Sequence, residues 1–322
     1  MMKPEVFYAK IMLFGEYSVI CDSMALTIPY AHFTGELRFV DQEQYTNYEL
    51  AQDSNQHLKC FLEYLKKLQE KKHLKNLLDL ERFEMDIRNG LYFESNIPQG
   101  YGIGSSGALV AAIYDQYANQ QDRNRKIFTG LEISKLKEIF SHMESYFHGV
   151  SSGLDPLLCY IRHPLLIRNK LQIETVGIPR DKFLSNSAIF LVDTGILGKT
   201  GPLVRLFSEK CKQEDFMSQV RNIFITANNG CIESLLKGEM EQFFNHLTEL
   251  SAFQFMYLPE MIPDTMKTAW ETGLHREDFK LKLCGSGGGG FLLGISRDFK
   301  STRKYFKQQG MELIPVFKHQ KD

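Results

Sequence analysis

The spacing of hydrophobic residues changes along this chain and predicts a mixture of helices and strands. Helical spacing of apolar residues occurs in Leu109–Ala118, Leu136–Phe147, Phe216–Leu236 and Met240–Phe253. Strands are predicted from short apolar runs at Val6–Phe14, Gly35–Val40, Phe83–Ile87, Ala188–Val192, Lys280–Cys284 and Leu313–Phe317. Because the two kinds of element do not alternate regularly, the pattern favours an α+β fold over a doubly wound parallel sheet.

The length of the chain indicates about two domains. It has 322 residues, of which 43% are hydrophobic, enough for a large buried core. A long helical block lies between the predicted strands Ala188–Val192 and Lys280–Cys284, whereas the first half begins with strands. We therefore expect an N-terminal domain over 1–175 and a C-terminal domain over 176–322.

Charge and composition exclude several classes of partner. The 39 acidic and 38 basic residues nearly cancel, so no global field would attract nucleic acid or an anionic membrane. We find no pattern of a signal peptide and no apolar run of about 18 residues that would span a membrane. The six cysteines occur singly, without the spacing of a zinc site, as is typical of free thiols in a reducing compartment. We expect a cytoplasmic protein, and the sequence allows either a monomer or a homodimer.

A glycine-rich loop, Pro98–Gly107, precedes an apolar helix that is predicted to begin near Ala108. Glycine allows positive φ angles and close approach of a ligand to the backbone. Free N–H groups and the helix dipole at a helix start attract an anion. Ser105 or Ser106 is expected to cap the helix and to offer a hydroxyl to phosphate or metal. The loop therefore predicts a phosphate-binding site.

Two better-known phosphate loops fit the sequence less well. A Walker loop ends in Gly-Lys-Ser/Thr, and no lysine follows here. Gly102, Gly104 and Gly107 satisfy the GxGxxG pattern of nicotinamide enzymes, but a buried strand directly before the loop and an acidic residue after a second strand are missing. A nicotinamide enzyme and a purely structural turn remain as alternatives.

Two carboxylates and one lysine are candidates for catalysis. Glu144 lies late on a predicted amphipathic helix, and Asp155 follows in a Gly/Ser loop that ends at a proline. One carboxylate would hold Mg²⁺ and the other would face a substrate hydroxyl. Lys10 interrupts an apolar strand, so it needs an anionic partner such as a phosphate or an aspartate, or an exit to solvent. We assign the nearby His148 to packing or to a turn.

These segments, together with the glycine-rich Cys284–Gly290, resemble the motifs of the GHMP kinase superfamily. The first motif is similar to Ala9–Ile11 with Phe14–Tyr17, the phosphate loop to Pro98–Gly107, and the third motif to Leu283–Gly289. The resemblance implies a ribosomal-S5-like N-terminal domain, a ferredoxin-like C-terminal domain, and ATP with Mg²⁺ as cofactors. It places the ATP-binding residues at Gly100, Gly102, Gly104, Ser105, Ser106, Gly107, Gly285, Ser286 and Gly287.

Within the superfamily, the chain is most similar to mevalonate kinases. Their His-Gly-x-x-Ser-Gly-x-Asp segment matches His148–Asp155, and their magnesium-binding glutamate matches Glu144. The resemblance implies that Ser106 and Glu144 hold Mg²⁺, that Asp155 is the catalytic carboxylate, and that Lys10 is its partner. It implies mevalonate as the small-molecule substrate, phosphorylated on its primary hydroxyl in isoprenoid biosynthesis. Candidate substrate-binding residues are Glu16, Tyr17, Ser152, Lys199 and Thr200.

Two positions differ from the mevalonate kinase pattern. Tyr17 stands where these kinases usually carry His, and Gly-Glu-Tyr is common in phosphomevalonate kinases. Gly107 stands where the phosphate loop usually carries Ala. A phosphomevalonate kinase or a sugar kinase is therefore the alternative enzyme. A catalytically inactive binding module is a further alternative, which the joint presence of Lys10, Ser106, Glu144 and Asp155 disfavours.

Overall fold

A computed structural model describes residues 5–40, 47–71, 77–119, 128–169, 172–179, 182, 186–198 and 200–318. Contacts divide the chain into two compact units. The first comprises Met1–Lys10, Pro29–Pro98 and Gly104–His163, and the second comprises Ile11–Ile28, Gln99–Ile103 and Pro164–Asp322. Each unit is thus built from several separate segments of the chain. The expected domains 1–175 and 176–322 stay a prediction.

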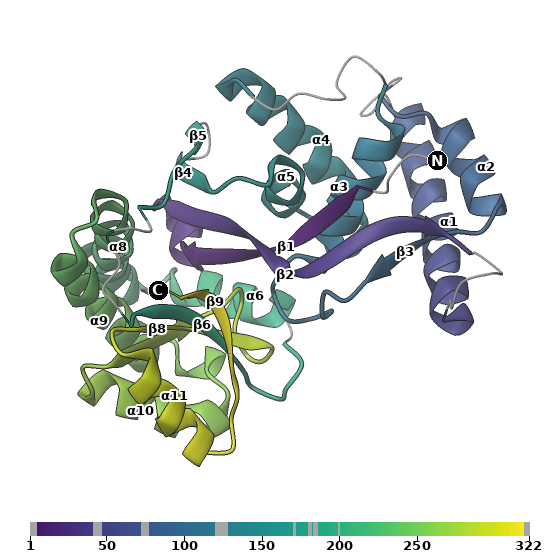
Figure 1. The fold of residues 1–322 in the computed structure, drawn as a ribbon. Helices are drawn as coiled ribbons and strands as arrows, with labels where there is room; N and C mark the ends of the chain where they lie inside the picture. The colour runs from purple at the N-terminus through teal and green to yellow at the C-terminus, as the bar shows by residue number, and fades with distance from the viewer. Residues whose placement is uncertain are drawn as a thin grey trace. The chain divides into compact units, whose positions relative to one another are not determined.

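The first unit is mainly helical. It contains α1 (Tyr48–Glu70), α2 (Leu80–Arg88), α3 (Ser105–Tyr117), α4 (Gly130–His148) and α5 (Leu154–Ile161). Helix α3 is buried over most of its surface and packs on α4 and α5 (Figure 1). A capping box starts α4, because Thr129 accepts from the Glu132 N–H while Glu132 accepts from the Thr129 N–H. The ends of α3, α4 and α5 carry the predicted metal ligands Ser106 and Glu144 and the predicted catalytic Asp155.

Two long strands near the N-terminus organise a five-stranded sheet. Its order is β1 (Val6–Phe14), β2 (Ala25–Phe39), β4 (Leu165–Asn169) and β5 (Gln172–Thr175), and β3 (Leu91–Ser95) pairs with β2. The end of β2 pairs antiparallel with β3, with Gly35 opposite Ser95. The start of β2 pairs antiparallel with β4, with Ala25 opposite Ile167.

The second unit contains a four-stranded antiparallel sheet in the order β7 (Phe279–Leu283), β8 (Phe291–Ser296), β6 (Ala188–Asp193) and β9 (Leu313–Lys318). Its helices are α6 (Thr200–Lys210), α7 (Glu214–Gln219), α8 (Ile225–Lys237), α9 (Met240–Tyr257), α10 (Asp264–His275) and α11 (Phe299–Gln308). A π-helical turn, Val220–Phe224, joins α7 to α8. Helices α10 and α11 lie next to each other in Figure 1, and Phe306 of α11 packs on Phe190 of β6 and Phe279 of β7.

The predicted α+β class is confirmed, and one predicted strand is wrong. Phe83–Ile87 belongs to helix α2, in which Leu80, Phe83 and Ile87 are buried. These three residues follow helical spacing and form one apolar face, and the Asp79 side chain caps the helix start. The apolar residues within Phe83–Ile87 thus follow helical spacing and not the alternation of a strand.

Two expectations from composition can be compared with the structure. The six cysteines are all free. In the part of the chain that the structure describes, no helix is both long and apolar enough to cross a membrane.

Candidate active site

The glycine-rich loop leads into α3 through a left-handed turn. Gly100, Gly102 and Gly104 have φ angles of 78°, 73° and 84°, which favour glycine. Gly104 is the N-cap residue, and α3 begins at Ser105 rather than near Ala108. The prediction that Ser105 or Ser106 caps the helix is therefore wrong, because both already lie in the first turn. Backbone N–H groups in a first turn have no partner within the helix, so this end can accept an anion.

Lys10 and Asp155 form an ion pair in the first unit. The Lys10 Nζ lies 3.0 Å from the Asp155 Oδ1, and the lysine is buried. Asp155 lies in the first turn of α5, where the helix dipole favours a carboxylate. The expected anionic partner of Lys10 is thus an aspartate. A Cβ at Gly104 would lie 2.6 Å from the Lys10 Cγ, so glycine at this position leaves room for the lysine stem.

The starts of α3 and α5 approach each other closely at Gly107. A Cβ on Gly107 would lie 2.9 Å from the Asp155 carbonyl carbon and 2.9 Å from the Pro156 nitrogen. Carbon atoms in ordinary contact are about 3.5–4.0 Å apart. The absence of a side chain at Gly107 therefore permits the position that Asp155 has beside α3.

Glu144 is buried next to two hydroxyl groups. Ser106 donates to its Oε1 at 3.2 Å, and Ser151 donates to its Oε2. Burial, with a smaller contribution from the charge of Asp155, raises the pKa of Glu144 to about 7. The two serine hydroxyls and Lys10 act in the opposite direction. A carboxylate that burial has desolvated in this way binds a cation or a proton strongly.

The segment between α4 and α5 is held against α4. Ser141 donates from its hydroxyl to the Ser151 carbonyl oxygen at 2.6 Å. A Cβ on Gly153 would lie 2.1 Å from the Lys137 carbonyl oxygen, so this position needs glycine for close packing as well as for its φ of 73°. Ser152, a predicted substrate-binding residue, is exposed, and its Oγ lies 3.4 Å from the Leu154 N–H. This packing fixes where Ser151 and Asp155 lie relative to Glu144.

Two residues of this cluster were not predicted as site residues. The exposed ring of His148, which the sequence assigned to packing or a turn, has its Nε2 3.0 Å from the Ser106 Oγ. Ser151 contacts Glu144 directly. The sequence signals were their position between Glu144 and Asp155 and their place in the segment that matches mevalonate kinases, and neither says which side chains turn inward.

The donor set of this cluster fits Mg²⁺ better than zinc. Within the described ranges there is no group of three or more His, Cys, Asp or Glu that could hold a metal ion. Mg²⁺ prefers oxygen ligands and retains waters and substrate phosphates, so one carboxylate and one hydroxyl from the protein suffice. Ser106 and Glu144 lie within hydrogen-bond distance and supply such a pair.

Three loops come together in the second unit. A Cβ on Gly198 would lie 3.2 Å from the Gly100 carbonyl oxygen and 3.3 Å from the Gly287 carbonyl oxygen. A Cβ on Gly285 would lie 3.2 Å from the Gly102 Cα. The backbone of the predicted third motif thus contacts the start of the predicted phosphate loop and the segment before α6. Thr200 begins α6, and Lys199 lies outside the described residues.

Glu16 and Tyr17, predicted to bind substrate, make contacts within the second unit. The buried Glu16 forms an ion pair with the fully buried Lys282 of β7, with Oε1 and Nζ 2.6 Å apart. The Tyr17 hydroxyl donates to the Ser286 carbonyl oxygen, and burial raises the pKa of Tyr17, so the proton is retained. Both side chains therefore support β7 and its loop, and their contact with a substrate stays a prediction.

Residues 57–162 match the family model described as GHMP kinases N terminal domain. This range includes Ser106, Glu144 and Asp155, and the superfamily resemblance inferred from the motifs is confirmed. Lys10 and the predicted third motif lie outside the matched range. No curated protein sequence matches the chain.

Solved structures of three kinases share the fold over nearly the whole chain. The L. major mevalonate kinase in complex with R-mevalonate has 17% identity and a TM-score of 0.64, covering 100% of this chain and 98% of that one. Streptococcus pneumoniae phosphomevalonate kinase has 16% identity and a TM-score of 0.62, covering 99% of both chains. Lactococcus lactis galactokinase complexed with galactose has 16% identity and a TM-score of 0.65, covering 97% and 93%. The chain therefore has the GHMP kinase fold, and the similar scores do not select a substrate.

Proposed function

We propose that this chain, whose residues 57–162 match the family model of the GHMP kinase N-terminal domain, is an ATP-dependent kinase that phosphorylates the primary hydroxyl of mevalonate. The observation that carries the proposal is the ion pair between buried Lys10 and Asp155, next to the N-terminus of α3. Ser106 in the first turn of α3 contacts Glu144 near the end of α4, so free backbone N–H groups, a proposed metal-binding pair and the Asp155 carboxylate lie close together. A further structure of S. pneumoniae phosphomevalonate kinase contains phosphomevalonate and AMPPNP, in keeping with ATP as the donor here.

The proposed reaction transfers the γ-phosphoryl group of ATP to an alcohol oxygen. The N–H groups at the start of α3 bind the phosphates, and Asp155 accepts a hydrogen bond from the substrate hydroxyl and orients it. Lys10 keeps Asp155 ionised and stabilises negative charge on the transferring group. Ser106 and Glu144 would hold Mg²⁺, which would neutralise charge on the phosphates. The hydroxyl proton passes to Asp155 late, as the O–P bond forms and ADP leaves, because the transition state of phosphoryl transfer is loose.

Mevalonate is favoured over other alcohols by the sequence around the site. His148–Asp155 matches the segment of mevalonate kinases, and a mevalonate kinase is among the similar structures. Phosphomevalonate or a sugar is the alternative acceptor, since Tyr17 departs from the mevalonate kinase pattern and both other kinases share the fold. We expect the enzyme to act in the cytoplasm as a monomer or homodimer.

The test is a panel of acceptors with the purified chain, ATP and Mg²⁺. We expect ADP release with mevalonate to exceed that with phosphomevalonate, galactose and no acceptor, and mass spectrometry to find a mevalonate monophosphate. Asp155→Asn is the matched control, because it preserves shape but removes the negative charge. We expect it to bind an ATP analogue while turnover falls by about 10³-fold or more. Phosphorylation of another acceptor alone would reject mevalonate, and wild-type turnover in Asp155→Asn would reject the mechanism.

A further inference from the structure

A separate group of cationic side chains lies on α11 in the second unit. Lys300, Arg303, Lys304 and Lys307 follow the spacing i, i+3, i+4 and i+7, so they share one face of the helix. All four line a hollow of about 580 Å³, which is also bounded by the residues before β6 and at the start of β9. One lining residue, Glu312, is acidic. The hollow is thus strongly positive on a chain whose formal net charge is -1.

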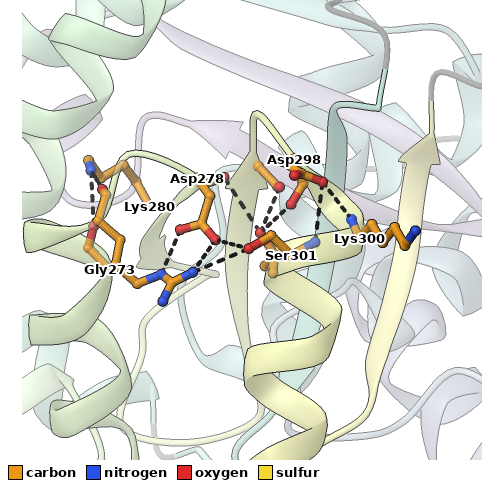
Figure 2. Close-up of polar contacts among 9 residues, drawn as sticks. Gly273, Asp278, Lys280, Asp298, Lys300 and Ser301 are labelled. Carbon is orange, nitrogen blue, oxygen red and sulfur yellow. Dashed lines mark hydrogen bonds and ion pairs between the residues drawn. The ribbon is translucent and has the colours of Figure 1, made fainter.

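Two carboxylates near the start of α11, those of Asp298 and Asp278, accept hydrogen bonds from groups other than the four cationic side-chain heads. Asp298 caps the helix, since its Oδ1 accepts from the N–H groups of Lys300 and Ser301 at 3.0 and 3.2 Å. Asp278 accepts from the Arg276 guanidinium at 2.7 and 2.6 Å and from the Ser301 hydroxyl at 2.8 Å. Figure 2 shows both carboxylates within this network and the Lys300 side chain extending away from it. Among the described residues, no ion pair joins any of the four cations to a carboxylate.

Helix α11 holds these cations on a fixed backbone. Thr302 is fully buried, and its hydroxyl lies 2.8 Å from the Ser296 hydroxyl of β8. Phe306 is also fully buried and packs on Phe279 and Phe190 of the sheet. The helix backbone is therefore fixed, and the four cations extend from its opposite, exposed face.

The arrangement of charges favours the binding of an anion. Like charges at i, i+3 and i, i+4 destabilise a helix, and the first-turn position of Lys300 places a cation at the positive end of the helix dipole. Lys307 lies in the last turn, where the dipole favours a cation without any ligand. The distinctive part of the group is consequently Lys300, Arg303 and Lys304.

We infer that the α11 hollow binds a small molecule that carries a di- or triphosphate group. Its volume is within the range of about 300–1,000 Å³ typical of small-molecule pockets. Arginine binds two phosphate oxygens at once, and neighbouring lysines add point charges, a combination that suits adjacent phosphates. The residues of the hollow are distinct from those of the candidate active site, and the inference does not depend on the proposed kinase activity.

The test is calorimetric titration of the full chain with inorganic tripolyphosphate, after saturation with AMPPNP and Mg²⁺ to occupy the proposed nucleotide site. We compare the wild type with Arg303→Gln/Lys304→Gln. The matched control is Lys59→Gln/Lys67→Gln, which removes the same charge from exposed positions on α1. Thermal unfolding confirms that each double variant is folded, and kinase turnover is measured in parallel.

We expect the wild type and the α1 control to bind one equivalent of tripolyphosphate. In the α11 variant the association constant should fall by about 10-fold or more, because two charge-assisted contacts are lost. AMPPNP binding and turnover should stay at the wild-type level in all three proteins. If AMPPNP itself does not bind, the kinase proposal fails, and the titration without nucleotide still compares the variants.

Equal affinity of the α11 variant and the wild type would overturn the inference, as would no binding at millimolar tripolyphosphate. A short nucleic-acid duplex that binds more tightly than tripolyphosphate, with the same loss in the α11 variant, would show that the face recognises a polymer and would reject the small-molecule ligand.

Discussion

Substituting alanine for Gly107 tests whether close packing of α3 on α5 sets the position of Asp155. The new Cβ would lie 2.9 Å from two backbone atoms of Asp155 and Pro156 and 3.1 Å from the Asp155 Cβ. Restoring ordinary contacts requires α5 to move away by about 0.5 Å or more. This movement would lengthen the 3.0 Å separation between the Lys10 Nζ and the Asp155 Oδ1. Because misplacement by about 1 Å can cost 10²-fold in rate, we expect kcat to fall by roughly 10-fold.

Stability and substrate affinity should respond differently from kcat. Overpacking costs about 1–3 kcal/mol, whereas alanine in place of glycine favours a helix by about 1 kcal/mol, so the net loss of stability should be small. The KM for ATP should change by less than about 2-fold, since the backbone N–H groups of α3 remain. Steady-state kinetics and thermal unfolding measure all three quantities.

A matched control is available in the same unit. Gly130 is the first residue of α4, and a Cβ there would meet no atom within 4 Å. Gly130→Ala should therefore leave kcat unchanged. Wild-type kcat in Gly107→Ala would refute the reasoning, because it would mean that Asp155 tolerates the displacement. An equal loss of kcat in both variants would also refute it.

Three further substitutions test the remaining members of the cluster. Lys10→Met should reduce kcat by about 10²-fold or more with a folded protein by circular dichroism, because Asp155 loses its partner; a normal rate would remove Lys10 from the mechanism. Ser106→Ala should raise the Mg²⁺ concentration needed for half-maximal activity, and an unchanged titration would argue against a ligand role. Glu144→Gln should stabilise the protein in EDTA at pH 8 by on the order of 1–3 kcal/mol relative to wild type, and hardly at pH 4.5. The sign follows because a pKa raised to about 7 makes the folded wild type hold its proton more tightly than the unfolded chain, so wild-type stability falls as pH rises from about 4.5 to 7. Urea unfolding across this pH range checks it, and a pH-independent difference between the two proteins would contradict the assignment.

Expectations about individual contacts and φ angles were confirmed where a residue's chemistry conflicted with its surroundings, whereas the functional roles of these residues stay predictions. Lys10 within an apolar strand required an anion, and it pairs with Asp155. Glu144 and Ser106 were assigned to one site, and they are in hydrogen-bond contact. The glycines at 100, 102 and 104 were expected to permit positive φ angles, and they do so. In each case one residue type has few acceptable environments, so the sequence restricts the structure strongly.

Predictions failed where packing chose between alternatives of similar local preference. Phe83–Ile87 has apolar residues that suit either a strand or a helix, and burial of Leu80 on the same face decides for the helix. Ser105 and Ser106 are both good caps, yet Gly104 takes the N-cap position, since a left-handed residue precedes the helix. The assignment of His148 to packing or to a turn did not include its contact with the Ser106 Oγ, 3.0 Å from its Nε2, because the two residues are far apart in the chain.

The sequence by itself determined the class of fold and the positive φ angles of the glycine loop, and it supplied the residue types that we propose for phosphate binding and catalysis. These depend on local properties: hydrophobic period, the backbone freedom of glycine, and the mismatch between a charged side chain and an apolar strand. Only the tertiary structure decided how closely Lys10 approaches Asp155, that Glu144 is desolvated, and that the cations of α11 line a hollow. The reason is that distance and burial between residues far apart in the chain follow from how whole elements pack, and one element's sequence does not contain that information.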